Sequence, residues 1–350
     1  MGSNEAAPAG LTDQPIAIGR RRLRSPVILA PMSGVTDLPF RRLVYALGAG
    51  LVVSEMVASE HLVQERHDAR RRAQGRELSP FVIQLAGCEA RWMAEGARVA
   101  EALGADIIDI NMGCPAREVT GKQSGSALMR DLAHALRLID AAVGAVTVPV
   151  TLKMRLGWDD ATRNAPELAR RAEAAGIRLI TVHARTRNQF FNGTADWQFV
   201  RQVKDAVRIP VVINGDIVDP ATARQALDAS GADAVMIGRG AYGAPWMPSR
   251  IAAALTTGND PGSPPLAEQG AIALDHVAAM IEQGGVHGLR GARKHIGWYL
   301  ASSRAPANDV KAWRRRLCTT ENAREVLSGL ADFYAQAAET AEREPGEMAA

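Results

Sequence analysis

Residues 209–240 read IPVVINGDIVDPATARQALDASGADAVMIGRG. The stretch begins and ends with an apolar run, and the segment DPATARQALDASGA between them has Ala and Leu at helical spacing. Each run is almost continuously apolar, as are the strands of a parallel sheet that is buried on both faces. The stretch therefore predicts a strand, a crossover helix and a second strand parallel to the first.

The same pattern extends back through the chain to residue 26. Eight short apolar runs alternate with helix-like stretches such as APELARRAEAAG (165–176). Eight strand–helix units predict a TIM (β/α)8 barrel, because the alternative, a doubly wound open sheet, usually has fewer strands and one ligand-binding switch point. The runs are PVILAPM (from Pro26), LVVSEMV (from Leu51), PFVIQLAG (from Pro80), DIIDINMG (from Asp106), VPVTLKMRLG (from Val148), LITVHAR (from Leu179), IPVVINGD (from Ile209) and DAVMIGRG (from Asp233).

The pattern changes after Trp246, where we expect a second, small all-helical domain. The predicted parts are a disordered N-terminus (1–14), the barrel (15–255), a Pro/Gly-rich linker (256–265), the helical domain (266–342) and a tail (343–350). Residues 281–316 contain eight Lys/Arg against two acidic residues, with Trp298, Tyr299 and Trp313 interleaved. This segment is either a solvated helical face or a surface that binds a polyanion.

Composition and cysteine usage exclude several classes of protein. The 350 residues are 47% apolar and 23% charged, which excludes a disordered or collagen-like chain. No apolar run approaches the roughly 18 residues that span a bilayer, and MGSNEAAPAGLTDQP at the start lacks the features of a signal peptide. We expect a cytoplasmic, monomeric protein that does not contact a membrane. Three widely spaced cysteines predict neither disulfides nor a metal site, but allow a reactive thiol.

Polar residues end almost every predicted strand. The carboxyl ends of the strands form the catalytic face of a TIM barrel. Each residue alone has a structural explanation, such as a core histidine for His183, but a barrel built for stability alone has no reason to gather such groups at one end. The strand ends carry Ala30-Pro31-Met32, Glu55, Gln84, Asn111 with Cys114, Lys153 with Arg155, His183 with Arg185, Asn214-Gly215-Asp216 and Gly238-Arg239-Gly240.

The last two strand ends, NGD (214–216) and GRG (238–240), suit a phosphate. Many barrels bind a phosphate here through backbone N–H groups, and Arg239 can add a charge-assisted hydrogen bond. GRGAYG (238–243) also matches G-x-G-x-x-G, but the acidic residue about 20 positions later, Asp260, lies in the Pro/Gly connector rather than after a second strand, so a Rossmann site is excluded. The pattern indicates a phosphate-bearing cofactor inside a barrel.

Three polar strand ends suit the rest of such a cofactor. Lys153 places a positive charge in the barrel mouth, where it can stabilise an anionic reduced cofactor. His183 and Gln84 can hydrogen-bond its polar edge. Together these groups indicate flavin chemistry.

Cys114 lies in the long loop NMGCPAREVTGKQSGSALM (111–129), whose Gly and Ser content predicts a mobile lid. A cysteine in this position can donate a proton or act as a nucleophile, or it is an inert small residue before Pro115. Cys88 leads into a helix-like run and is assigned to packing, and Cys318 is remote from the barrel in sequence.

The sequence resembles the tRNA-dihydrouridine synthases, and within them the bacterial DusB-type group, over about residues 15–340. NMGCP, KMR and NGD at these intervals are highly specific to the family. The resemblance rests on LAPMSGVTDLPFR (29–41), DINMGCPA (109–116), GSALM (125–129), VTLKMRLGW (150–158), TVHARTRNQFFNGTADW (181–197), PVVINGDI (210–217) and GADAVMIGRGAYGAPW (231–246).

The resemblance implies a barrel followed by a helical tRNA-binding domain, FMN as the bound cofactor, and NADPH as the reductant of the C5–C6 bond of particular uridines. It makes Cys114 the general acid that protonates C5 after hydride reaches C6. It also favours position 17 of the D-loop as the uridine that is reduced. Ala184 replaces the glycine of the family's usual HGRTR stretch. The implied flavin ligands are Ala30, Pro31, Met32, Gln84, Lys153, His183, Asn214, Gly215, Asp216, Gly238 and Arg239. The implied RNA contacts are Asn111, Arg155, Arg185, Arg290, Arg293 and Lys294.

Two alternatives remain open from the sequence. A small-molecule FMN enzyme of the dihydroorotate or dihydropyrimidine dehydrogenase kind shares the phosphate site and a loop cysteine, but leaves the basic helical domain unexplained. A non-catalytic RNA-binding module would keep the barrel only as a scaffold, and a flavin in the purified protein would argue against it.

Overall fold

The computed structural model describes residues 16–347. The predicted disordered segment 1–14 and the last three residues of the predicted tail lie outside the described residues. The chain divides into two compact units: the barrel unit reaches Arg239 and includes Pro248–Pro261, and the helical unit holds Gly240–Met247 and Gly262–Ala350. The predicted barrel domain, 15–255, had included the segment Gly240–Met247. None of the helices within the described range is long and apolar enough to cross a bilayer.

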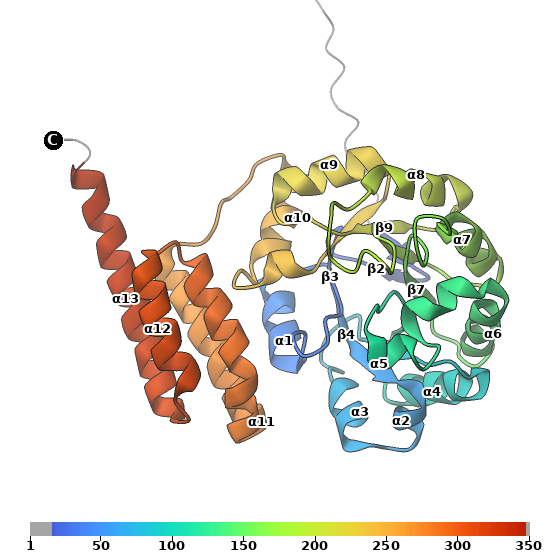
Figure 1. The fold of residues 1–350 in the computed structure, drawn as a ribbon, viewed down its shortest axis with the longest axis horizontal. Helices are drawn as coiled ribbons and strands as arrows, with labels where there is room; N and C mark the ends of the chain where they lie inside the picture. The colour runs from blue at the N-terminus through green and yellow to red at the C-terminus, as the bar shows by residue number, and fades with distance from the viewer. Residues whose placement is uncertain (1–15, 348–350) are drawn as a thin grey trace, which may run out of the picture. The chain divides into compact units, whose positions relative to one another are not determined.

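The barrel unit contains the eight predicted strands, all parallel and closed in the order β10-β3-β4-β5-β6-β7-β8-β9 (Figure 1). The predicted TIM barrel is therefore confirmed. The strands are β3 (Val27–Leu29), β4 (Leu51–Ala58), β5 (Val82–Ala86), β6 (Ile107–Met112), β7 (Val150–Arg155), β8 (Ile180–His183), β9 (Val211–Asn214) and β10 (Ala234–Ile237). The helices of this unit are α1 (Leu38–Leu47), α2 (Ser59–Val63), α3 (His67–Arg72), α4 (Ala90–Ala102), α5 (Arg117–Thr120), η1 (Gly125–Arg130), α6 (Leu132–Val143), α7 (Ala165–Ala174), α8 (Trp197–Ala206) and α9 (Pro220–Ser230), followed by η2 (Arg239–Ala241) and α10 (Met247–Thr257) at its boundary with the helical unit.

Helix α9 shows how local sequence sets the boundaries of one barrel helix. Asp219 is the N-cap, and its side chain accepts a hydrogen bond from the Thr222 backbone N–H at 2.7 Å. Pro220 fills the first turn, where no backbone N–H is needed. Gly231 ends the helix with a φ of 64°, in the left-handed region that favours glycine. An N-cap of this kind contributes about 1 kcal/mol.

A short hairpin that the sequence pattern did not reveal closes the amino end of the barrel. Strands β1 (Ala17–Ile18) and β2 (Arg21–Arg22) pair antiparallel. Arg21 bonds to Asp106, which directly precedes β6, so the hairpin lies at the amino ends of the strands. Ile18 and Leu23 are buried in the same apolar cluster as the inward-facing strand residues. The candidate site therefore has an apolar floor beneath it.

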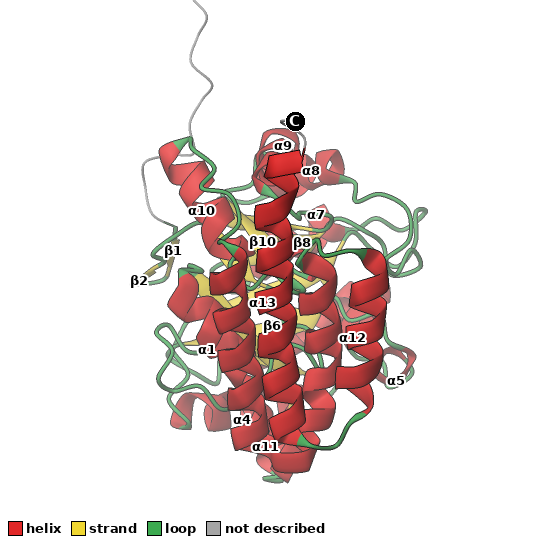
Figure 2. Ribbon diagram, turned by 90° about the vertical axis from the view of Figure 1, so that its left-hand side faces the viewer, coloured by secondary structure: helices red, strands yellow, loops and turns green. Residues whose placement is uncertain are grey.

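The helical unit consists mainly of α11 (Leu266–Ser302), α12 (Ala307–Thr319) and α13 (Ala323–Glu347), which run side by side (Figure 2). Helix α11 starts at the residue where the sequence pattern had placed the start of the helical domain. Gly285 has φ 52° and ψ −129°, so α11 is two helices joined at a kink. The core is apolar and comprises Ala273, Val277, Met280, Leu289, Ala292, Ile296, Tyr299, Leu300, Leu317, Val326, Leu330, Phe333 and Tyr334.

Candidate active site

Polar side chains of neighbouring strands meet inside the carboxyl half of the barrel. The register pairs Gln84 with Asp109, Asp109 with Thr151, and Asn111 with Lys153. Residues two apart on a strand share a face, so Asn111 and Lys153 lie one level above Asp109 and Thr151, toward the carboxyl ends. All five side chains are buried. Asp109 and Thr151 were absent from the sequence-predicted site, although the same two-residue alternation could have revealed them.

Hydrogen bonds link these side chains into a continuous network. Gln84 Nε2 donates to Asp109 Oδ2 at 2.7 Å, and Thr151 Oγ1 donates to Asp109 Oδ1 at 2.6 Å. Asn111 Nδ2 donates to Gln84 Oε1 at 2.8 Å. Gln84 is completely buried and uses both of its polar atoms within the protein. Its predicted contact with a flavin stays a prediction.

Cys114 sits where this network meets the loop after β6. Asn111 Oδ1 accepts hydrogen bonds from the backbone N–H groups of Gly113 at 3.2 Å and Cys114 at 3.0 Å. Burial raises the pKa of the Cys114 thiol, while the nearby charges of Arg155 and Lys153 oppose the shift. The thiol is therefore held in its protonated form at neutral pH. Of the other cysteines, Cys88 is half-buried after β5.

The predicted mobile lid is a folded segment in the structure. Residues 117–120 form α5 and residues 125–130 form the 3₁₀ helix η1, with a turn between them. Ser126 donates to Cys114 O through both its backbone N–H, at 3.0 Å, and its hydroxyl, at 2.8 Å. Leu128 and Met129 are buried. Glycine and serine indicated a flexible loop, but these two apolar anchors and the serine hydrogen bonds fix the segment against the barrel.

Burial also changes the protonation behaviour of Lys153 and His183. Burial and the adjacent Arg155 lower the pKa of Lys153 to about 8. The structure gives its ammonium one hydrogen-bond acceptor, Asn214 Oδ1, at 3.4 Å. Burial also lowers the pKa of His183 well below its usual value, so the imidazole is neutral at pH 7. The site thus presents one under-satisfied cation and one neutral imidazole.

Arg155 ties the loops after β6 and β8 together. Its Nε donates to Gly113 O at 2.8 Å, and its Nη1 donates to Thr186 O at 2.9 Å and Phe190 O at 2.8 Å. The side chain is 1% exposed, and burial lowers its pKa to about 10. The guanidinium therefore binds loop carbonyls through Nε and Nη1. These three hydrogen bonds do not use Nη2.

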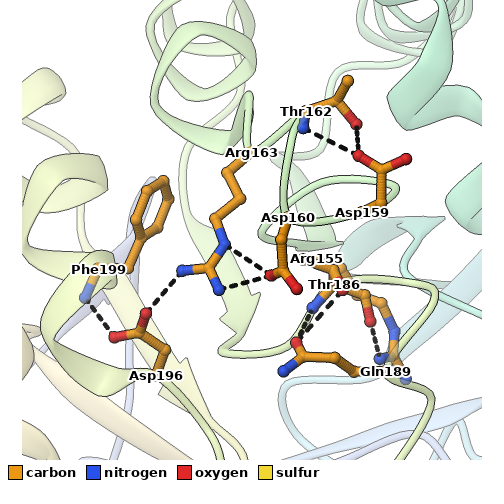
Figure 3. Close-up of polar contacts among 9 residues, drawn as sticks. All are labelled: Arg155, Asp159, Asp160, Thr162, Arg163, Thr186, Gln189, Asp196 and Phe199. Atoms are coloured by element: carbon orange, nitrogen blue, oxygen red, sulfur yellow. Dashed lines mark hydrogen bonds and ion pairs between the residues drawn. The ribbon is translucent and has the colours of Figure 1, made fainter.

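The loops after β7 and β8 are braced by further polar contacts (Figure 3). Arg163 bonds to Asp160 at 2.6 Å and to Asp196, the N-cap of α8, at 2.7 Å. Gln189 Oε1 accepts from the Thr186 backbone N–H at 2.8 Å. These bonds fix the loops on which the aromatic residues of the mouth lie.

Phe191 is an aromatic residue of the mouth that the sequence did not single out. It is 50% exposed, which is unusual for a phenylalanine. The guanidinium carbons of Arg155 and Arg239 lie 5.5 and 5.3 Å from its ring centroid, and the His183 ring lies 6.1 Å away. An exposed aromatic run such as FF, in a loop after a barrel strand, is the signal that could have revealed it.

The strand ends predicted to hold a phosphate are organised around Asp216. Its carboxylate accepts from buried Arg185 at 2.6 Å, from the Ala195 backbone N–H at 2.8 Å and from exposed Arg239 at 3.4 Å. Arg185 also donates to two loop carbonyls, at Asn192 and Gly193. Arg185, predicted to touch RNA, thus uses Nε and Nη2 inside the barrel unit, while its buried Nη1 has no hydrogen-bond partner among the described residues, and its RNA contact stays a prediction. Asp216 can contribute to a phosphate site only through its backbone, because its carboxylate is negative and already bonded.

Glycines line the space beside these groups. A Cβ on Gly238 would lie at ordinary contact distance from the predicted flavin neighbours Met32 and Ala30, at 3.7 and 3.9 Å. Gly215 has φ 120°, and a Cβ there would lie 3.1 Å from the His183 ring. Pro31 and Met32 are partly exposed. The strand ends of β3, β9 and β10 are therefore adjacent, as the prediction requires.

The predicted RNA-binding cations of the helical unit differ in their surroundings. Arg290 is paired with Glu321 at 2.9 Å, and Arg293, half-buried, donates to Thr320 O at 3.3 Å. Lys294 is exposed. Three more exposed cations of the basic segment 281–316 share one face of α12 and form the α12 basic row: Lys311, Arg314 and Arg315. Within the described part of the chain, no group of three or more metal-ligating side chains is arranged to hold a metal ion.

Comparisons with known proteins agree with this geometry. Two longer chains of known structure share the fold: histamine dehydrogenase from Rhizobium sp. 4-9 (TM-score 0.58, 14% identity, 94% of this chain and 64% of that chain) and 2-naphthoyl-CoA reductase (TM-score 0.54, 12% identity, 68% and 51%). A "Probable tRNA-dihydrouridine synthase" of Rhodobacter capsulatus is 56% identical over 83% of this chain and 91% of its own. The "tRNA-dihydrouridine synthase B" of Pseudomonas putida is 44% identical over 95% and 98%. Residues 28–340 match the family model described as dihydrouridine synthase, and the chain therefore belongs to the dihydrouridine synthase family.

Proposed function

We propose that this protein is a flavin-dependent tRNA-dihydrouridine synthase that reduces the C5–C6 double bond of a D-loop uridine, with position 17 favoured. FMN is the bound flavin, NADPH is the reductant and Cys114 is the general acid. One observation carries the proposal: two reactive groups lie at the same barrel mouth. These are the Lys153 ammonium, which has one hydrogen-bond acceptor at 3.4 Å, and the protonated Cys114 thiol. It is supported by membership of the family and by the names of its relatives.

The residues of the mouth fit a flavin. An ammonium with three donors and one acceptor at 3.4 Å needs a further acceptor, which the ring of a flavin supplies. Gly238 has no side chain, so the backbone at the end of β10 can approach a cofactor phosphate closely, and Arg239, 52% exposed, can add a charge-assisted bond to it. When bound, the flavin supplies the hydride that reaches C6 of the uracil. Lys153 favours the anionic reduced form by its charge.

Cys114 is suited to complete the reduction at C5. A general acid must hold its proton at the working pH, and burial keeps this thiol protonated. Asn111, at the end of β6, fixes the backbone of Cys114 and can hydrogen-bond the uracil through its remaining amide hydrogen. Arg155 presents Nη2 to the same base, because its other donors hold loop carbonyls.

Phe191 gives the flipped base a surface on which to stack. A uridine inside a folded tRNA cannot reach the barrel mouth, so it must be splayed out of its stack. Stacking on an aromatic side chain is worth about 1–3 kcal/mol per base and offsets part of that cost. The half-exposed ring beside Arg155 and Arg239 has this capability.

The helical unit supplies phosphate contacts that the sequence assigned to Arg290, Arg293 and Lys294. We place the larger share on Lys294 and the α12 basic row, because the charge of Arg290 is already matched by Glu321. Such contacts position RNA and carry little sequence information. They separate a tRNA-modifying enzyme from a small-molecule reductase.

The proposal is tested by two measurements on the native protein. The purified protein should release FMN on denaturation, identified by chromatography and mass. Dihydrouridine mapping of tRNA from a deletion strain should show loss at a D-loop position and its return on complementation. A protein without flavin after reconstitution, or an unaltered dihydrouridine map, would overturn the proposal.

A further inference from the structure

We propose that Asp109 is a positioning residue that forces the side-chain amides of Gln84 and Asn111 into one orientation and thereby holds the backbone of Cys114. The catalytic consequence rests on the proposed function, but the structural effect does not. Asp109 lies beneath the site and touches no part of the barrel mouth directly, because its two carboxylate oxygens are bonded to Gln84 and Thr151.

The network runs from Asp109 to the loop through two amides. Gln84 Nε2 donates to the carboxylate, Asn111 Nδ2 donates to Gln84 Oε1, and Asn111 Oδ1 accepts from the N–H groups of Gly113 and Cys114. We call these four bonds the amide relay. All three side chains are at most 7% exposed, so water does not compete for these bonds.

The two ends of the amide relay leave only one arrangement of the two amides that satisfies every group. An ionised carboxylate can only accept hydrogen bonds, and a backbone N–H can only donate. Gln84 must therefore turn its NH2 group to Asp109, which leaves its oxygen for Asn111. Asn111 must then turn its NH2 group to Gln84, which leaves its oxygen for Gly113 and Cys114. Reversing either amide would bring like atoms face to face in a buried site.

The choice of a carboxylate here is otherwise costly. Burial raises the pKa of Asp109, and only Thr151, Gln84 and the charge of Lys153 oppose that shift. An apolar residue would fill a barrel interior at lower cost. The carboxylate is explained if it strengthens the amide relay: a charged acceptor holds the NH2 group of Gln84 more firmly than the neutral oxygen of an amide at this position would.

The decisive test compares three variants by residue-resolved amide hydrogen exchange. In Asp109→Asn the charged acceptor of the amide relay becomes a neutral one, so exchange at Gly113 and Cys114 should become faster by roughly five- to thirtyfold, the difference between a charge-assisted and a neutral hydrogen bond. Strands β5 and β7 should keep their protection. Thr151→Val is the matched control, because it removes the other bond to Asp109 and leaves the amide relay intact; exchange there should stay within about twofold.

A double variant provides the rescue. In Asp109→Asn combined with Gln84→Glu, position 84 offers only oxygens, so it again accepts from Asn111 and is satisfied by the amide at position 109. Protection of the Gly113 and Cys114 amides should return. A general loss of packing predicts the opposite, that two changes are worse than one. Unaltered exchange in Asp109→Asn, equal acceleration in Thr151→Val, acceleration spread over β5 and β7, or no rescue would each overturn the proposal.

Activity measurements then separate the amide relay from the proposed function. Asp109→Asn should leave the rate of flavin reduction by NADPH unchanged and lower kcat for oxidation of the reduced flavin by tRNA. A wild-type protein that does not modify tRNA would refute the proposed function and leave the exchange result standing. A normal kcat in a variant with accelerated exchange would refute the catalytic consequence.

Discussion

Replacing Lys153 with methionine should stabilise the flavin-free protein at neutral pH. The unfolded chain binds the lysine proton below about pH 10.5, whereas burial allows the folded chain to bind it only below about pH 8. As the pH falls from 10.5 to 8, protonation therefore favours the unfolded state, by about 1.4 kcal/mol per pH unit. Below pH 8 both states are protonated and the penalty stays constant. The shift of about 2.5 units corresponds to a penalty of about 3 kcal/mol at pH 7 and about 1 kcal/mol at pH 10.

The assay is denaturant unfolding of flavin-free wild type and Lys153→Met at pH 7, 8.5 and 10. The gain in unfolding free energy should shrink by about 2 kcal/mol between pH 7 and pH 10. Lys122→Met, at an exposed position of the same unit, is the control and should give no such trend. A gain that is the same at every pH would show that burial does not depress the pKa of this lysine, and would refute the reasoning.

The candidate acid, RNA surface and phosphate ligand each give a measurable outcome. Cys114→Ala should leave flavin reduction by NADPH nearly intact and slow oxidation of the reduced flavin by tRNA about 10²–10⁴-fold, whereas Cys88→Ala should change neither rate; turnover lost only in Cys88→Ala would place the acid elsewhere. Alanine at all three positions of the α12 basic row should flatten the log–log salt dependence of tRNA binding by about 2 to 3, at roughly 0.7–0.9 per phosphate contact, while Arg290→Ala, whose charge is paired, should change it little. Equal slopes for these two variants would argue against α12 as the RNA surface. Arg239→Ala should weaken FMN retention by about 1.5–3 kcal/mol, read from the quenching of flavin fluorescence, and an unchanged Kd would contradict its role at the phosphate.

The barrel could be predicted from the sequence because continuous apolar runs leave few other folds. The fifth of these runs also predicted that Lys153 lies in the barrel mouth, with Arg155 at the same strand end. Strand periodicity does not indicate which groups the end of a long side chain contacts. The Arg155 guanidinium binds the carbonyls of Thr186 and Phe190 in the loop after β8, and the sequence of this loop has no periodic pattern that predicts its path. The sequence thus indicates which side chains lie at the strand ends, but not which loop groups they contact.

Charge counting has a similar limit. A local excess of Lys and Arg predicts a basic surface, but Glu321, in the turn between α12 and α13, lies 31 residues after Arg290 and pairs with it at 2.9 Å. The helical turns after Cys114 were also not predicted, because Gly and Ser content describes the flexibility of an isolated loop and not its packing. Leu128 and Met129, buried at the end of that segment, decide its order.

The hairpin beneath the barrel sets the shortest fragment worth expressing. The apolar pattern alone starts the first barrel strand at Pro26, and a shortened clone beginning there would include every barrel strand. Such a clone would lack Ile18 and Leu23, which are 0% and 2% exposed. Burying each is worth about 1.5–3 kcal/mol, so their joint loss is comparable with the whole stability margin of many proteins. Expression libraries and crystallisation variants of this enzyme should therefore begin before Ile16.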